Sequence, residues 1–307
     1  MAPTEEDRFA AAERLWASGD GKTAVAEHVD LMRRGQNPEL RLRSALILLE
    51  RVNPGWNVDV ILEACLTGIE MTEKLGETST RAYLMGVRAK TLAVWSGSLV
   101  TARKNLKMGP GWLGFSLERD EEQHKSLSTL IEANEKEVER LTHDAQKESG
   151  DPATLGHVLC SMGNISFQRY LNLKCDSLQK LVRLPAFLRE LLRSYALDEY
   201  LWYSLHDRQT MRTHLNKCER RYSEAVMAFR AAGDEVNVAY AFYAMANDLR
   251  SANRFRKAMR YLRQAETIAR RLNDLTLLGR IPVLKERIRQ RNRNVPNYVA
   301  GEGDTNK

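Results

Sequence analysis

The sequence predicts an all-α protein in which antiparallel helix pairs stack into a solenoid. Apolar residues recur at intervals of three and four along most of the 307 residues, which is the spacing of a buried helix face. Only eight prolines and eighteen glycines interrupt this pattern, and several of the glycines fall between two apolar stripes, as short turns require. A single pair cannot bury its apolar face alone, so such pairs are expected to stack on one another.

The clearest pair is predicted over residues 239–273, with a turn over 251–253. The buried stripe of its first helix comprises Ala239, Phe242, Met245, Ala246 and Leu249. The buried stripe of its second helix comprises Phe255, Ala258, Leu262, Ala265 and Ala269. The alanines let the two helices approach closely, and the larger side chains fill the space beyond them.

Similar spacing occurs earlier in the chain. Residues 8–28 form a candidate pair with Gly19 in the turn, and residues 86–106 form another with Gly97 in the expected turn. Residues 222–232 give a further half pair. Three helices are expected to end at a residue that readily adopts the left-handed backbone conformation. These residues are Gly76, Gly233 and Asn273.

The middle of the chain is less regular. A long helix is expected over 116–148, with a seam of residues spaced alternately by four and three: Leu127, Ile131, Asn134, Val138, Leu141 and Ala145. This seam fits either an ordinary long helix packed within the chain or a dimerising coiled coil. The predicted organisation is therefore helix pairs over 1–107, an irregular helical middle over 108–215, helix pairs over 216–291, and a disordered tail over 292–307.

The pair at 239–273 resembles the tetratricopeptide repeat. From Phe242 it reads F-x2-M-A-x2-L, followed by Ala258-x3-Leu262, with smaller or softer residues than the family pattern has at most positions. The resemblance is fair over 5–107, partial over 218–234 and absent over 108–215. It implies a right-handed superhelical solenoid of antiparallel helix pairs with a concave groove.

In that family, the first helices of successive pairs line the groove. Carried over by position, the ligand-facing residues of the best pair are Tyr240, Tyr243, Asn247 and Arg250. The corresponding places in the pair at 83–106 are Leu84, Val87, Thr91 and Val94, with Arg88 and Trp95 beside them. We therefore predict a partner-binding groove that includes Tyr240, Tyr243, Asn247, Arg250, Arg88, Thr91 and Trp95.

No catalytic or metal-binding pattern accompanies these repeats. Gly21-Lys22-Thr23 ends like a phosphate-binding loop, but Trp16 stands where that loop needs glycine, and the preceding sequence is helical. His157 and Cys160 share a helical face, yet a metal site needs three or four donors. The sequence therefore predicts a protein that is not an enzyme and that has no cofactor or metal.

Charge is distributed unevenly along the chain. Between Arg212 and Arg293 there are nineteen Lys or Arg residues against eight Asp or Glu, whereas Glu118–Glu148 has ten acidic against five basic residues. The second helix of the best pair carries a basic stripe, which comprises Arg256, Arg260, Arg263 and Arg270. Such a stripe suits a phosphate backbone, an anionic membrane or an acidic protein surface, and it is equally typical of a solvated helix face.

These features predict a protein–protein interaction scaffold or adaptor that holds a partner segment in its groove. Two alternatives remain: a nucleic-acid-associated subunit that uses the basic C-terminal third, and a sensor of a peptide or small ligand that regulates a partner protein.

No apolar run approaches the roughly 18 residues of a membrane span. Four widely spaced cysteines suggest reduced thiols and a cytoplasmic location. We expect a protein partner, at most weak non-specific binding to nucleic acid, and no membrane; a homodimer is also open.

Overall fold

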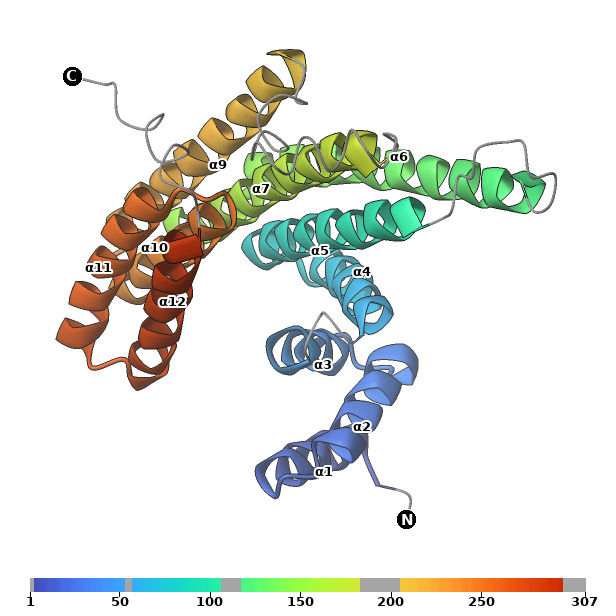
Figure 1. Cartoon of the computed structure of the whole chain (residues 1–307). Coiled ribbons are helices and arrows are strands. Elements are labelled where there is room, and N and C mark those ends of the chain that lie inside the picture. The colour runs from blue at the N-terminus through green and yellow to red at the C-terminus, as the bar shows by residue number, and fades with distance from the viewer. Residues whose placement is uncertain (1–2, 53–56, 106–116, 183–204, 295–307) are drawn as a thin grey trace. The chain divides into compact units, whose positions relative to one another are not determined.

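Every regular element is an α-helix in a computed structural model of the chain, which describes residues 3–52, 57–105, 117–182 and 205–294 (Figure 1). Within these residues the expectation of an all-α protein is confirmed. None of the described helices is long and apolar enough to cross a membrane. The helices are α1 (Glu5–Ala17), α2 (Gly21–Arg34), α3 (Pro38–Arg51), α4 (Val58–Leu75), α5 (Thr78–Asn105), α6 (Leu117–Glu148), α7 (Pro152–Val182), α9 (Leu205–Ala231), α10 (Glu235–Ser251), α11 (Phe255–Leu272) and α12 (Leu275–Asn294).

The chain divides into two compact units. The first comprises residues 1–150 and 168–214, and the second comprises 151–167 and 215–307. One division falls between α6 and α7, and the other two fall inside α7 and α9. The boundaries expected at 107 and 215 stay a prediction. Of the expected tail, residues 292–294 belong to α12 and the remainder lies outside the described residues.

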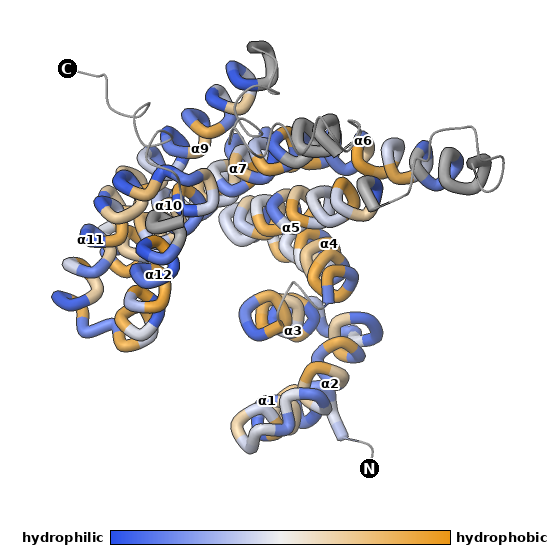
Figure 2. Tube along the Cα trace, in the orientation of Figure 1, coloured by the Kyte–Doolittle hydropathy of each residue, from blue (hydrophilic) through white to orange (hydrophobic). Residues whose placement is uncertain are grey.

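In the first unit, each helix from α1 to α6 packs against the next one along the chain. The apolar stripes of neighbouring helices meet in small clusters rather than in one central core. One cluster joins α2, α3 and α4 through Met32, Leu48 and Ile61, and another joins α3, α4 and α5 through Leu42, Met71 and Leu84. Figure 2 shows the apolar residues spread along all of the helices, as this sequential packing requires.

The expected helix ends are confirmed. Gly76, Gly233 and Asn273 all have positive φ values, of 73°, 72° and 54°, at the ends of α4, α9 and α11. A side chain with a Cβ atom is strained in this conformation, which glycine adopts freely and asparagine tolerates. The first expected turn is also present, because Gly19 has a φ of 91° and lies between α1 and α2.

The helix pair at 239–273 is confirmed as α10 and α11, which pack against each other. All ten residues of the two predicted apolar stripes are buried. On α11 the stripe includes three alanines with no exposed surface, Ala258, Ala265 and Ala269. The closeness of the two helices therefore depends on side chains of this size.

The turn expected at Gly97 is wrong. Residue 97 lies inside α5, which runs unbroken from Thr78 to Asn105, so residues 86–106 are not a helix pair. A Cβ atom at this position would lie 3.3 Å from Oε1 of Gln168 and 3.4 Å from Oδ1 of Asn172, both on α7. Glycine inside a helix costs about 1 kcal/mol relative to alanine. Here the missing side chain makes room for a neighbouring helix instead of breaking its own.

The long helix expected at 116–148 is present as α6. Five residues of its seam are buried, and the sixth, Leu127, is half-buried. Much of this burial comes from α5, which packs along α6. The five buried seam residues are Ile131, Asn134, Val138, Leu141 and Ala145. The seam is thus covered within the chain, as the first of the two interpretations expects.

A histidine joins the first three helices. The side chain of His28 on α2 has no exposed surface, and its Nε2 atom lies 3.2 Å from Oε1 of Glu13 on α1. Its Nδ1 atom lies 3.5 Å from Oγ of Ser44 on α3, and its ring meets the ring of Phe9 edge to face. Burial lowers the pKa of His28 below its ordinary value of 6.5, although Glu13 opposes this shift.

This pKa shift makes the stability of the first unit depend on pH. Because the unfolded chain takes up the His28 proton more readily than the folded chain, stability is full above pH 6.5 and falls as the pH drops below it. We expect the free energy of unfolding to decrease between pH 7.5 and 5.5, by at most about 1.4 kcal/mol per pH unit from this group. Urea unfolding of the wild type and of His28→Gln at both pH values measures this decrease. An equal pH dependence in the two proteins would contradict the assignment of the decrease to His28.

The packing of α11 gives a second test. Replacing Ala258 by leucine adds three carbon atoms at a site with no exposed surface, and overpacking of this kind costs about 1–3 kcal/mol. Replacing the exposed Arg263 on the same helix by alanine should change stability by less than about 0.5 kcal/mol. Urea unfolding followed by circular dichroism compares the two variants. Similar losses in both would mean that the buried stripe of α11 is wrongly placed.

Candidate binding surface

The second unit has an open groove between α9 and α11, with part of α10 as its floor. Its volume is about 420 Å³. The groove follows helix periodicity, because residues three and four apart on one helix lie side by side on its surface. The lining residues are Ser223, Val226, Met227 and Arg230 from α9, Phe242 from α10, and Arg260, Tyr261 and Gln264 from α11.

The floor of the groove is apolar and aromatic. Phe242 stacks on Tyr261, with ring centroids 6.0 Å apart and ring planes 17° from parallel. Val226 and Phe242 are buried, whereas Met227 on the rim is 62% exposed. Methionine is flexible and polarisable, so it adapts to many partner shapes. The groove therefore offers an incompletely covered apolar surface.

The edges of the groove are basic. Arg230 and Arg260 belong to its lining, which contains no Asp or Glu residue. The guanidinium of Arg260 lies 5.1 Å from the ring centroid of Tyr261, and its Nη2 atom donates to the tyrosine hydroxyl at 3.4 Å. On α9 the nearby carboxylate of Glu224 accepts hydrogen bonds from Arg220 and Arg221. The charged residues that line the groove are thus both positive.

Polar contacts among α9, α10 and α11 hold the walls of the groove together. The hydroxyl of Tyr222 on α9 donates to Oδ2 of Asp248 on α10 at 2.9 Å, and both side chains are buried. Burial, more than the nearby Asp248 charge, raises the pKa of Tyr222 well above its ordinary value. Lys257 on α11 donates to Glu219 on α9 at 3.0 Å. These contacts fix the spacing of α9, α10 and α11.

Glycines of α7 admit the aromatic side chains of α9. A Cβ atom at Gly156 would lie 2.6 Å from the ring of Phe229, and one at Gly163 would lie 3.0 Å from the ring of Tyr222. No ordinary side chain fits at the first of these positions without movement of the ring. The two glycines therefore set how closely this part of α7 approaches the back of α9.

The predicted groove residues of α10 do not line this groove. Tyr240, Tyr243, Asn247 and Arg250 share one side of α10 and are partly exposed. At 3.6 residues per turn this is a different side of the helix from Phe242. Arg250 donates to Oδ1 of Asn247 at 3.3 Å and to the hydroxyl of Ser251 at 3.2 Å, which orders the stripe. The role of these four residues in binding stays a prediction.

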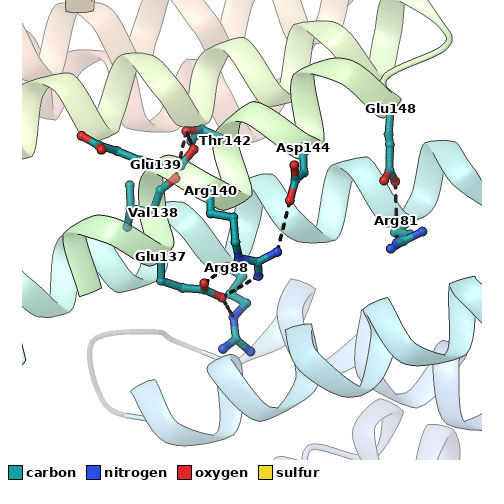
Figure 3. Close-up of polar contacts among 9 residues, drawn as sticks. All are labelled: Arg81, Arg88, Glu137, Val138, Glu139, Arg140, Thr142, Asp144 and Glu148. Carbon is teal, nitrogen blue, oxygen red and sulfur yellow. Dashed lines mark hydrogen bonds and ion pairs between the residues drawn. The ribbon is translucent and has the colours of Figure 1, made fainter. Parts of the chain in front are cut away.

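The three predicted residues of α5 lie in the other unit, and two of them take part in helix packing. Thr91 is buried, and its hydroxyl donates to the carbonyl of Val87 at 2.9 Å. The side chain of Arg88 is 19% exposed, and its Nε atom lies 3.8 Å from Oε1 of Glu137 on α6. Figure 3 shows Glu137 between Arg88 and Arg140, and the guanidinium of Arg140 bonds to it through two nitrogens. Trp95 remains partly exposed.

All four residues of the predicted basic stripe on α11 are exposed, but the structure divides their roles. Arg260 lines the groove. Arg270 pairs with Glu266 at 2.9 Å, and Glu266 also accepts a hydrogen bond from Lys285 on α12. By helix periodicity Arg263 lies on the same flank as Arg270. Only part of the stripe is therefore available to a ligand in the groove.

Sequence reasoning missed most of the groove. Of its lining residues only Phe242, as a core residue, and Arg260, as part of the basic stripe, were singled out. The available signal was Met227, a large apolar residue that lies off the buried stripe of Tyr222, Ala225 and Phe229. That signal indicates an exposed apolar residue, but it does not identify the helices beside it.

Other candidate chemistry takes a structural role. Gly21-Lys22-Thr23 forms the first turn of α2, and the Thr23 amide donates to the carboxylate of Asp20 at 3.2 Å. The ring of His157 packs edge to face on Phe229. The described residues include no group of three or more His, Cys, Asp or Glu placed to hold a metal ion. Comparison of the sequence with protein-family models and with curated proteins finds no match.

Proposed function

We propose that this chain is a non-enzymatic scaffold or adaptor that binds a protein partner on the surface of tetratricopeptide-like helix pairs in the cytoplasm. The observation that carries the proposal is the groove between α9 and α11. Its exposed methionine, aromatic floor and two arginines are a mixture often found where binding energy concentrates in protein interfaces. The helix pair α10–α11, with two fully buried stripes, gives this surface a rigid support.

The helix packing also favours this function. Helices that each contact the next along the chain leave their outer faces open, and stacked helix pairs commonly use such faces to hold partners. The right-handed superhelix implied by the family resemblance belongs to the same proposal. In it, the partly exposed stripe of Tyr240, Tyr243, Asn247 and Arg250 is a second candidate surface on α10.

Copurification from native cells tests the proposal. We expect the tagged full-length chain to retain a stoichiometric protein partner after nuclease treatment. Met227→Glu, which places a charge on the apolar rim, should abolish retention, because a carboxylate cannot be buried there without a large desolvation cost. Arg263→Ala serves as the matched control on α11 and should retain the partner.

A further variant separates the two surfaces. If Tyr243→Ala with Arg250→Ala releases the partner while Met227→Glu retains it, the stripe on α10 is the binding surface and the groove is not. Circular dichroism and the melting temperature show that each variant remains folded. Loss of every protein partner on nuclease treatment would count against the proposal itself.

A nucleic-acid-associated subunit remains the second candidate, because all four arginines of the basic stripe are exposed. The stripe has few aromatic side chains for base stacking; Tyr261 is engaged with Phe242 and Arg260. Some of the positive charge is also neutralised, as in the pair of Arg270 with Glu266. These contacts favour the protein partner.

We therefore expect only weak, salt-sensitive and sequence-blind binding to nucleic acid. Each phosphate contact releases counterions, so the affinity of such binding falls steeply with salt. Fluorescence anisotropy with labelled single- and double-stranded oligonucleotides at about 150 mM salt measures it. Tight and saturable binding at that salt concentration would make nucleic acid the preferred partner.

A further inference from the structure

We infer that the groove between α9 and α11 binds an acidic amphipathic helix of a partner protein, with a large apolar side chain inserted over Phe242 and carboxylates on both sides of it. This inference rests on the proposed function and specifies the chemistry of the partner. Three features of the groove support it: its walls, its floor and its charge.

The walls of the groove are two helices, and the side chains on their surfaces form ridges along which a third helix can pack. On α9 the lining runs from Ser223 to Arg230, which is about two helical turns or about 10 Å along the axis. On α11 it comprises Arg260, Tyr261 and Gln264, about one turn. Ridges of residues three and four apart accept the matching ridges of another helix. The described residues contain no strand, so the pairing of an extended peptide with a sheet edge has no counterpart here.

The floor of the groove determines what the helix must insert. Phe242 and Val226 are mostly covered by their own chain, but Met227 is 62% exposed and Tyr261 is partly exposed. Burying apolar surface contributes about 25 cal/mol per Å², so an apolar side chain laid across these residues is favoured. The volume of about 420 Å³ falls at the lower end of the range of about 300–1,000 Å³ for ligand sites. This suits one or two side chains rather than a whole domain.

The charge at the edges of the groove determines what flanks the inserted side chain. Arg230 stands on the α9 side and Arg260 on the α11 side, and no Asp or Glu belongs to the lining. Arginine binds a carboxylate through two parallel hydrogen bonds. A helix with glutamates three or four residues before and after its apolar residue places carboxylates near both arginines. A basic helix would be repelled at the same positions.

Defined peptides test this inference. The probe is a labelled 18-residue alanine-based helix with two central leucines four residues apart and flanking glutamates. Two comparison peptides replace the glutamates by lysines or move one leucine to the opposite face of the helix. In anisotropy titrations with the full-length chain, we expect saturable binding of the first peptide and at least tenfold weaker binding of the other two. Equal binding of all three, or no binding of the first at about 1 mM protein, would overturn the inference.

Variants of the chain locate the site. Met227→Ser should weaken binding of the first peptide at least fivefold, and Arg230→Glu with Arg260→Glu should weaken it at least tenfold. Arg263→Glu with Arg270→Glu is the matched control. It changes the net charge equally on the other flank of α11, and it should weaken binding less than threefold. Similar losses in the two double variants would show general charge attraction instead of a groove site.

Two further outcomes would reject the inference that the groove binds an acidic helix of a partner protein. Sedimentation velocity over a range of concentrations shows whether the free chain associates with itself. Self-association that Arg230→Glu with Arg260→Glu abolishes would mean that a second copy occupies the groove, against the inference. Retention of the native partner by that same double variant would also reject the inference, while the proposed function as a protein-binding scaffold would stand.

Discussion

The need to cover one apolar stripe on every helix governs both units. On α11 the constraint is clearest: Phe255, Ala258 and Leu262 are buried on one side, and five arginines are exposed on the others. A single helix of this kind has no reason to be stable alone, because most helical stability in proteins comes from packing of the apolar side. Each helix therefore depends on its neighbours, and within α1–α6 and within α10–α12 each helix packs against the next one along the chain.

Polar contacts within this packing determine which arrangement is adopted. Tyr222 and Asp248 form a buried pair between α9 and α10, and His28 with Glu13 joins α2 to α1. A buried polar group without its partner costs about 1–3 kcal/mol, so a shifted helix would lose more than apolar contact. The groove follows from the first of these pairs. Tyr222 anchors the inner side of α9 and, by helix periodicity, leaves Met227 on its outer side.

The turns and the best helix pair could be predicted because their causes are local. Gly76, Gly233 and Asn273 end helices through their own backbone preferences, and the alternation of Phe242, Met245 and Leu249 identifies a buried face without any knowledge of its partner. Gly97 failed as a turn because its role is not local. It makes room for Gln168 and Asn172, more than seventy residues later in the sequence.

The sequence by itself determined that this protein is helical, where several of its helices end, and which side of α11 is basic. The tertiary structure decided which sides of the helices are accessible. Thr91 matches a ligand-facing place in the repeat pattern and Arg88 stands beside such a place, yet α6 packs along α5, and Arg88 faces Glu137. The groove needed three helices at once, since Met227, Phe242 and Tyr261 come from different ones. Periodicity assigns a residue to one side of its helix, but only packing decides whether that side meets solvent, a neighbour or a partner.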